Sequence, residues 1–460
     1  MRVQRTMVQR PWTKQRPAAP SHIDALSIGA DLLTIFIGLS ASFSVHLVGT
    51  LYVSEVALLF LWPILLFFRA RRLLRPRLLT CFGLLALWLV NQVVTDIYRS
   101  TPARDWMRGD AAILFFAVDI VALAILLAGN DRRKVFFIAS FAIGSLLAAR
   151  YQPLPIMEGD EWKFGYSSGV HLLVVLLCCY FFKSRKYVPI IFLLLGMMSF
   201  NLFMNYRSSV LFFLVTLVLV VPIVPERFGN LRVLPRVGSV SRIAVLAGLA
   251  VIAGLMALSA VNFATASGML GEDAKAKNEM QMRARGGILL GGRPEIFVSS
   301  RAVYDSPILG HGSWARDFRY TEMLSDIQAR WGNTTDLEDI EAQSLGLIPA
   351  HSHLMGAWVW AGIFGAVFWA YILWFTFKAL FRVLNTLPPL APVYVWMFVD
   401  YVWAILFSPF GSTDRTLEAL KIVVIIDLVG QGVKFARSRA SRRRWRRLGP
   451  QHLPPRTRTV

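Results

Sequence analysis

Two arginines in this sequence stand beside features that would hold a guanidinium next to an anion. Arg207 lies in Asn205-Tyr206-Arg207, a very short polar connection between two apolar runs. Arg293 follows two glycines and precedes Pro294, where the spacing predicts the start of a helix whose end carries a positive potential. A guanidinium presents its N–H groups as a planar fork that fits phosphate, so each position predicts an anion clamp. The alternative for each is a solvated arginine at the membrane surface or in a loop.

Four further side chains would assist such a clamp. Arg283, Arg285 and Arg301 lie in the same polar segment as Arg293 and could replace it or act with it. Tyr206 precedes the first arginine and would share its ligand. We therefore take Tyr206, Arg285 and Arg301 as candidate substrate-binding residues.

A pair of histidines follows the same polar segment, in Ala350-His351-Ser352-His353. Histidine is the side chain best suited to proton transfer near neutral pH, so His351 is the candidate base and His353 a candidate binding residue. Two histidines with this spacing could also ligate a metal. However, no acid or cysteine stands at a metal-like spacing, and the three cysteines all fall inside apolar runs. We therefore expect no metal site, and the remaining alternative is a structural histidine at the membrane surface.

The elements that must position these residues are membrane-spanning helices. Of the 460 residues, 55% are hydrophobic and the mean hydropathy is +0.52, which is more apolar surface than a soluble protein can bury. A run of about 20 apolar residues crosses a bilayer as a helix, and no run alternates with the period of a membrane strand. We predict an all-α polytopic protein with twelve transmembrane helices, over residues 26–44, 53–68, 78–96, 110–128, 135–149, 166–182, 187–204, 208–224, 243–262, 353–377, 391–408 and 417–433.

The basic residues orient these spans. A net charge of +21 would suit nucleic-acid binding, but Lys and Arg stand between the apolar runs, where they follow the positive-inside rule. Most of the 49 Lys and Arg fall on the side of the two termini, the basic segment 1–25 and the Arg-rich tail 434–460. We therefore expect cytoplasmic termini, spans over 26–262 and 351–433 in a bacterial inner membrane, and the large loop 263–350 in the periplasm.

The large loop has the pattern of an ordered unit. Apolar residues after Pro294 recur on one face at helical spacing, namely Ile296, Phe297, Val303 and Tyr304. The glycines of segment 310–312 predict a tight turn, and Thr334 or Thr335 would cap a second helix over 335–345.

Five acids lie inside the predicted spans: Asp31, Glu55, Asp119, Asp400 and Asp427. Intramembrane acids often mark a transport or proton path. Here they scatter over five spans with no relay spacing. We therefore expect each to pair with an Arg, Asn or Trp that faces the bundle, and assign them no chemistry.

These features, in this order, resemble the O-antigen ligase and polymerase superfamily of membrane glycosyltransferases. Twelve spans hold one large outer loop between spans nine and ten, and Arg207 to Leu211 matches an Arg-x3-Leu pattern. The loop contains a run similar to the family's Arg, aromatic and Pro-apolar-apolar-Gly-x-Gly stretch, here Gly292-Arg293-Pro294-Glu295-Ile296-Phe297 and then Asp305-Ser306-Pro307-Ile308-Leu309-Gly310-His311-Gly312. The loop leaves through a His-x10-Gly pattern, His351 to Gly362, although the family usually has Asn where this chain has Ser352.

The resemblance implies a fold and an activity, namely a membrane glycosyltransferase of the GT-C type with a helical periplasmic lid. The donor would be a glycan on undecaprenyl (di)phosphate, and no cofactor would take part. Arg207 and Arg293 would stabilise the leaving diphosphate without a metal, and His351 would accept or position the proton of the acceptor hydroxyl. A carboxylate, Glu295 or Asp305, could serve as the base instead.

The resemblance leaves two versions of this activity open. A ligase would join the glycan to lipid A–core, and a polymerase would join it to a second lipid-linked glycan. The Arg-x3-Leu and His-x10-Gly patterns favour the ligase, whereas Arg301 to Gly312 has the Arg-x10-Gly spacing of a polymerase.

Two further classes are a lipid-linked sugar transporter and a scaffold among polysaccharide assembly proteins. The absence of an internal sequence repeat argues against the transporter. The expected partners are the bilayer, the lipid-linked donor, the acceptor and other assembly proteins, with no nucleic acid.

Overall fold

A computed structural model of the chain describes residues 25–46, 49–69, 73–221, 293–331, 345–411 and 415–430, with a few isolated residues between 248 and 275. The described part is almost entirely helical, as the composition predicts. The predicted span over 243–262 and the loop helix over 335–345 fall outside it, apart from isolated residues. So do both terminal segments, 1–24 and 431–460.

Helices occupy eleven of the twelve predicted spans. They are α1 (Ala25–Ser40), α2 (Val53–Arg69), α3 (Pro76–Tyr98), α4 (Ala103–Leu127), α5 (Asp131–Tyr151), α6 (Ser167–Lys183), α7 (Tyr187–Phe203), α8 (Arg207–Val220), α15 (His353–Thr386), α16 (Ala391–Phe407) and a helix over residues 415–430. Among the described residues, five helices are long and apolar enough to cross a membrane: α3, α4, α5, the Trp162–Lys183 segment that contains α6, and α15. The all-α class and the membrane character are therefore confirmed.

Local signals in the sequence set the helix ends. Pro76 begins α3, where its missing N–H costs nothing. Asn130 caps α5 by accepting a hydrogen bond from the Arg133 N–H at 3.2 Å, and Ser352 caps α15 through the Met355 N–H at 3.1 Å. The turn between α7 and α8 places Asn205 in the left-handed region, with φ of 53°.

One predicted span ends early. The expected helix over 26–44 stops at Ser40, and the chain then forms a two-stranded antiparallel hairpin of β1 (Ser44–His46) and β2 (Thr50–Tyr52). The amide of Gln152 explains the change, because it binds Ser44 as a strand would. Its Oε1 accepts from the Ser44 N–H at 2.9 Å and its Nε2 donates to the Ser44 carbonyl at 2.8 Å.

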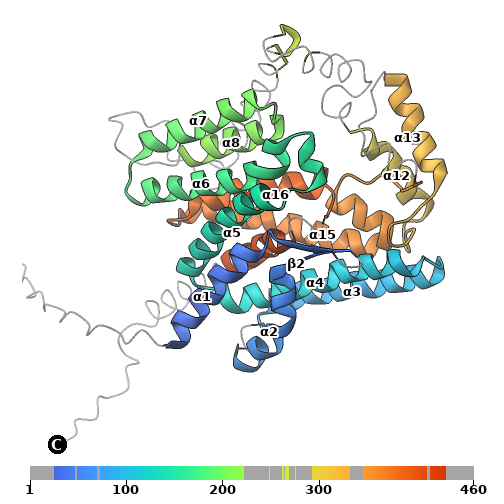
Figure 1. Cartoon of the computed structure of the whole chain (residues 1–460), viewed down its shortest axis with the longest axis horizontal. Helices are drawn as coiled ribbons and strands as arrows, with labels where there is room; N and C mark the ends of the chain where they lie inside the picture. The colour runs from blue at the N-terminus through green and yellow to red at the C-terminus, as the bar shows by residue number, and fades with distance from the viewer. Residues whose placement is uncertain are drawn as a thin grey trace, which may run out of the picture.

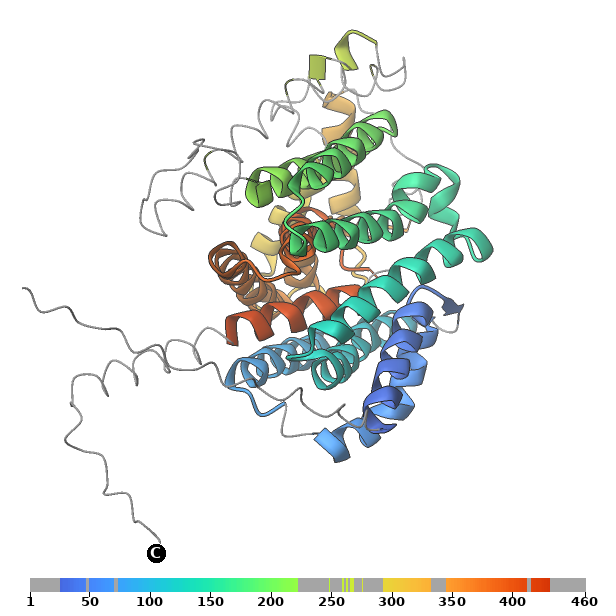
Figure 2. The same ribbon diagram turned by 90° about the vertical axis from the view of Figure 1, so that its left-hand side faces the viewer.

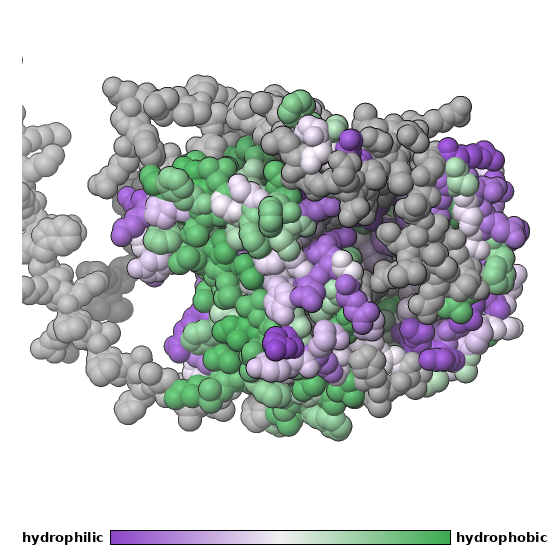
Figure 3. Space-filling view, turned by 45° about the horizontal axis from the view of Figure 1, so that its top comes forward, coloured by the Kyte–Doolittle hydropathy of each residue, from purple (hydrophilic) through white to green (hydrophobic). Residues whose placement is uncertain are grey.

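The helices form one bundle with the helix over 415–430 at its centre. Figures 1 and 2 show α6, α7 and α8 on one side of this helix and α3 and α4 on the other. Every residue from 415 to 428 is buried. On the face shown in Figure 3, apolar residues gather towards the left and hydrophilic residues towards the right, the end that carries α12 and α13 in Figure 1.

All five intramembrane acids have polar partners, as predicted. The partners are Arg, Lys and Thr rather than Asn or Trp: Asp31 binds Arg132 and Arg133, Glu55 binds Arg415, Asp119 binds Thr416, Asp400 binds Lys421, and Asp427 binds Arg75 and Lys134. A charge inside a bundle is tolerated when an opposite charge meets it with good geometry.

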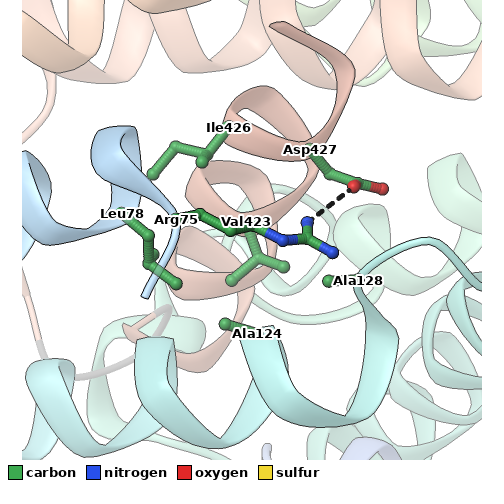
Figure 4. Close-up of a pocket in the computed structure, with 7 residues that line it drawn as sticks. All are labelled: Arg75, Leu78, Ala124, Ala128, Val423, Ile426 and Asp427. Atoms are coloured by element: carbon green, nitrogen blue, oxygen red, sulfur yellow. Dashed lines mark hydrogen bonds and ion pairs between the residues drawn. The ribbon is translucent and has the colours of Figure 1, made fainter. Parts of the chain in front are cut away.

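Asp427 shows how one end of the bundle is joined. It accepts from Lys134 Nζ at 2.8 Å, from Arg75 at 3.1 Å and from the Gly129 N–H at 3.0 Å. Figure 4 shows Arg75 crossing a small pocket to reach this carboxylate. The residues that the charge rule places in the cytoplasm thus converge at one end of the bundle.

Glu55 and Arg415 make a second deeply buried pair. The Arg415 guanidinium donates to both Glu55 oxygens at 2.6 and 2.8 Å, and a further N–H reaches the Thr50 carbonyl at 3.1 Å. The two side chains are 5% and 0% exposed. This pair fixes the last helix against the start of α2.

We predict that Arg415→Leu lowers the free energy of unfolding by about 3–5 kcal/mol, because the Glu55 charge stays buried without its counter-ion. The measurement is thermal unfolding in detergent. The matched control is Arg301→Leu, which breaks an exposed pair with Asp305 and should cost at most about 1 kcal/mol. Equal costs for the two variants would contradict this reading of the pair.

The large loop contributes two described helices, α12 (Glu295–Asp305) and α13 (Phe318–Trp331). The predicted helix start at Pro294 is confirmed. The expected apolar face is wrong, since Phe297 and Tyr304 are exposed and the buried face is Glu295, Val298, Ser299 and Ala302. Small side chains on this face let α12 pack closely against α15.

Loop segment 306–316 docks into a kink of α15. At the kink, Ala361 and Gly362 leave helical geometry, with φ of −116° and 59°. The carbonyls that the kink frees are bound from outside the helix. The N–H groups of His311 and Gly312 donate to the carbonyls of Val359 and Trp360 at 2.7 and 3.0 Å.

Side chains of α3 complete the docking from the other side. Asn91 Nδ2 donates to the Ala361 carbonyl at 2.5 Å, and Thr95 Oγ1 donates to the Leu309 carbonyl at 2.6 Å. Asp96 accepts from the N–H and the hydroxyl of Ser313, both at 2.6 Å. The loop, α3 and α15 therefore form one hydrogen-bonded unit.

Two glycines make this docking possible. Gly310 has φ of 87°, and a Cβ there would lie 2.6 Å from both the Gly362 nitrogen and the Trp360 carbonyl oxygen. Gly362 has φ of 59°, and a Cβ there would collide with the Ile308 carbonyl. The predicted tight turn at 310–312 is confirmed, and the glycines at these two positions serve close backbone contact.

We predict that Gly310→Ala destabilises the protein by at least roughly 1–3 kcal/mol, from left-handed strain alone before the steric clash. Thermal unfolding in detergent measures the change. Gly83→Ala is the matched control, because an added methyl there meets open space inside α3 and should raise stability by up to about 1 kcal/mol. Equal unfolding temperatures for the two variants would show that the docking of segment 306–316 into the kink of α15 does not stabilise the protein.

Candidate functional site

The structure brings Arg293 and His351 together. Arg293 directly precedes α12 and His351 directly precedes α15, and these two helices pack against each other. The two residues lie close enough for the arginine charge to act on the imidazole. A residue pair separated by most of the large loop thus shares one surface, as the sequence predicts.

His351 is held in its neutral form by its surroundings. Burial, foremost, and the positive charges of Arg293 and Lys163 together lower its pKa to about 4. The imidazole is therefore unprotonated at neutral pH. A neutral imidazole has a free nitrogen lone pair, which is the form that can accept a proton.

Lys163 is the site residue that the sequence analysis missed. It lies in Trp162–Tyr166, a π-helical turn at the start of α6, and its N–H donates to Asp160 Oδ1 at 2.8 Å. The available signal was a lysine between Trp162 and Phe164, directly before an apolar run on the predicted outer side. π-Helical turns of this kind often occur at functional positions.

The guanidinium of Arg293 is largely removed from solvent. Burial lowers its pKa, and the neighbouring Glu295 carboxylate partly offsets this effect. Arginine stays charged in proteins despite such shifts. A desolvated cation attracts an anionic ligand more strongly than one in water.

Arg207 is the first residue of α8. It lies next to a group of hydrogen-bonded and stacked side chains that also contacts the π-helical turn of Lys163. Its Nε donates to Asn205 Oδ1 at 3.2 Å. The neighbouring Tyr206 ring stacks on His171 at 6.1 Å, and His171 Nε2 lies 3.1 Å from Asn201 Oδ1. This network therefore joins the turn that carries Arg207 to α6 and α7.

The side-chain amide of Asn201 also contacts the π-helical turn that carries Lys163. Asn201 Oδ1 also accepts from Trp162 Nε1 at 3.0 Å, and Trp162 precedes Lys163 in the chain. The turns of Arg207 and Lys163 are therefore fixed to each other through Asn201.

Three other candidates lie elsewhere or are already engaged. His353 faces the bundle interior, with Nδ1 2.7 Å from the Ser408 carbonyl and its ring 4.7 Å from Trp369. Arg301 binds Asp305 at 3.0 Å. The Tyr320 hydroxyl, foremost, and the nearby arginines hold the pKa of Asp305 below its usual value, which weakens it as a base. Arg285 and Arg283 lie outside the described residues.

In the part of the chain that the structure describes, no three His, Cys, Asp or Glu side chains are placed to hold a metal ion. No family model and no curated protein matches the sequence. The chemistry of the site therefore rests on the arrangement of Arg293, Lys163 and His351.

The depressed pKa of His351 predicts a pH-dependent stability. The unfolded chain binds a proton at this histidine near pH 6.5 and the folded chain only near 4, so the free energy of unfolding falls as pH falls through this window. We expect His351→Asn to lose less thermal stability than the parent protein between pH 7.5 and 5.0. The same loss in both proteins would contradict a buried, neutral His351.

Proposed function

We propose that the chain is a membrane glycosyltransferase that moves a glycan from undecaprenyl (di)phosphate to an acceptor hydroxyl, using Arg207, Arg293, Lys163 and His351. The observation that carries the proposal is the placement of neutral His351 close to the charges of Lys163 and of Arg293, whose guanidinium is desolvated. A base close to an anion clamp is what this reaction needs.

The residues would act on opposite sides of the bond that is exchanged. The acceptor oxygen attacks the anomeric carbon while the bond from that carbon to the diphosphate oxygen breaks. The arginines and Lys163 stabilise the negative charge that grows on the leaving diphosphate. His351 receives the proton of the acceptor hydroxyl, which completes the balance of charge.

The cations also control when His351 can act. Without a donor, Arg293 and Lys163 disfavour a proton on the imidazole. A bound diphosphate would neutralise these charges and raise the affinity of His351 for a proton. The base would therefore gain strength when the donor is in place.

The membrane setting supports an outer-face reaction. In Figure 1, α12 and α13 lie on the right-hand side of the molecule, above the right-hand ends of α3 and α4. The inner cluster of Arg75, Lys134 and Asp427 lies at the opposite ends of its helices. Twelve crossings, cytoplasmic termini and a periplasmic loop in a bacterial inner membrane fit this arrangement.

A ligase that uses lipid A–core as acceptor is the version we favour. The polymerase spacing of Arg301 and Gly312 is used structurally here, because Arg301 binds Asp305 and a Cβ at Gly312 would lie 2.6 Å from Thr101 Oγ1. A polymerase that extends a second lipid-linked glycan is the alternative. A lipid-linked sugar transporter is the alternative from another class.

We predict transfer activity when the purified protein is reconstituted with an undecaprenyl-diphosphate glycan and lipid A–core. A product that requires the core supports the ligase, and a ladder without core supports the polymerase. His351→Ala, Arg293→Ala and Arg207→Ala should each lower kcat/KM by about 100-fold or more. Arg150→Ala, an exposed cation at the end of α5, should leave it unchanged. Movement of sugar lipid across the bilayer without transfer would overturn the proposal.

A further inference from the structure

A second group of cations lies at the start of α4, apart from Arg293 and Lys163. It consists of Arg104 and Arg108 of α4 and Arg316 of the loop, together with Trp314, and we refer to these four residues as the α4 patch. The charges of Arg104 and Arg316 both act on Arg108. No role for this group follows from the reaction described above.

Arg108 is held ready for a ligand. Its guanidinium lies 3.9 Å from the centroid of the Trp314 ring, and Trp314 packs in turn against Trp360 at 5.6 Å. Stacking occupies the flat face of the guanidinium and leaves the N–H groups at its edge available. Within the described residues these N–H groups meet no acceptor, which leaves the donor edge open for an anion.

The charge of the patch is not balanced from within. Asp105 is the one carboxylate that acts on Arg108, and it already binds Arg316 at 3.0 Å. Among the described residues, Arg108 and Arg316 therefore share the charge of Asp105, and Arg104 adds a further positive charge. A bound anion would reduce the repulsion between these arginines. A phosphate or a carboxylate can accept two hydrogen bonds from one guanidinium group.

The backbone connects this patch to the proposed base. Arg316 forms an antiparallel bridge with Leu347, and the Ile348 N–H donates to the Ala315 carbonyl at 2.9 Å. His351 follows Leu347 by four residues, a separation of at most roughly 14 Å along an extended chain. A sugar chain anchored at Arg108 would thus lie within reach of His351.

We propose that the α4 patch binds the acceptor through an anionic group on its sugar chain, a phosphate or a uronate carboxylate. This inference rests on the proposed transferase function and deepens it, since it names the acceptor as an anionic glycan. The donor diphosphate meets Arg293 and Lys163, and the acceptor anion meets Arg108 and Arg316. The two substrates therefore approach His351 from separate cation groups.

Binding of a phosphorylated oligosaccharide tests the proposal without any donor. The full-length protein is placed in zwitterionic nanodiscs, and its affinity is compared for that oligosaccharide and for the same one after phosphatase treatment. We expect about 10-fold or more tighter binding of the phosphorylated form, weakened by salt. Arg108→Ala and Arg316→Ala should reduce the affinity to the level of the dephosphorylated form.

Arg319→Ala is the matched control. This arginine lies three residues from Arg316, is 77% exposed, and already donates to both oxygens of Asp317. Its loss should leave the affinity unchanged. Trp314→Phe should keep most of the affinity and Trp314→Ala should lower it, because an aromatic face orients Arg108.

Three results would overturn the inference. The first is equal affinity for the two oligosaccharide forms, and the second is an unchanged acceptor KM in Arg108→Ala. The third is complete displacement by phosphatidylglycerol added to the nanodisc, which would make the patch a lipid site. If the protein binds the phosphorylated form at the α4 patch but transfers no glycan, the proposed function is wrong and the anion site of the α4 patch still stands.

Discussion

The exchange of hydrogen bonds at the kink of α15 is the contact on which the end of the molecule that carries α12 and α13 depends. A kink inside a membrane helix frees carbonyl groups that no water can reach, and each needs a new donor. Here the N–H groups of His311 and Gly312, together with Asn91, supply those donors. The loop is therefore fixed to the bundle by its own backbone, in a way that requires glycine at 310 and 362. The placement of Arg293 and His351 depends on this docking, because Arg293 lies just before α12 and His351 just before α15.

This docking changes how the two loop motifs are understood. The Gly-x-Gly and His-x10-Gly patterns look like separate signals along the chain, yet their glycines meet each other in the folded protein. The second spacing sets how far His351 lies along the chain from the kink, and the glycines of both patterns serve the close backbone contact there.

Apolar runs and charge position predicted eleven of the described helices, because a helix in lipid must satisfy its own backbone and its length follows from the bilayer. The pairing of the buried acids was predictable because an isolated charge inside a helix bundle is energetically costly. The hairpin at Ser44 was not predictable, because it depends on Gln152, which lies 108 residues away. The buried face of α12 was missed because Val298 and Ala302 pack against a helix that local spacing cannot place. Lys163 was missed because its position near His351 comes from a π-helical turn.

The charged side chains of the described chain fall into two kinds. Those inside the bundle, such as Arg415 with Glu55 and Lys421 with Asp400 and Glu418, meet opposite charges within hydrogen-bond distance. Those around His351 and around Arg108 have more positive than negative neighbours. Unbalanced, partly desolvated charge destabilises a fold unless a ligand supplies the missing sign. The matched pairs of the interior stabilise the bundle that carries this imbalance, and under the proposed function the imbalance would select substrates that are themselves anionic.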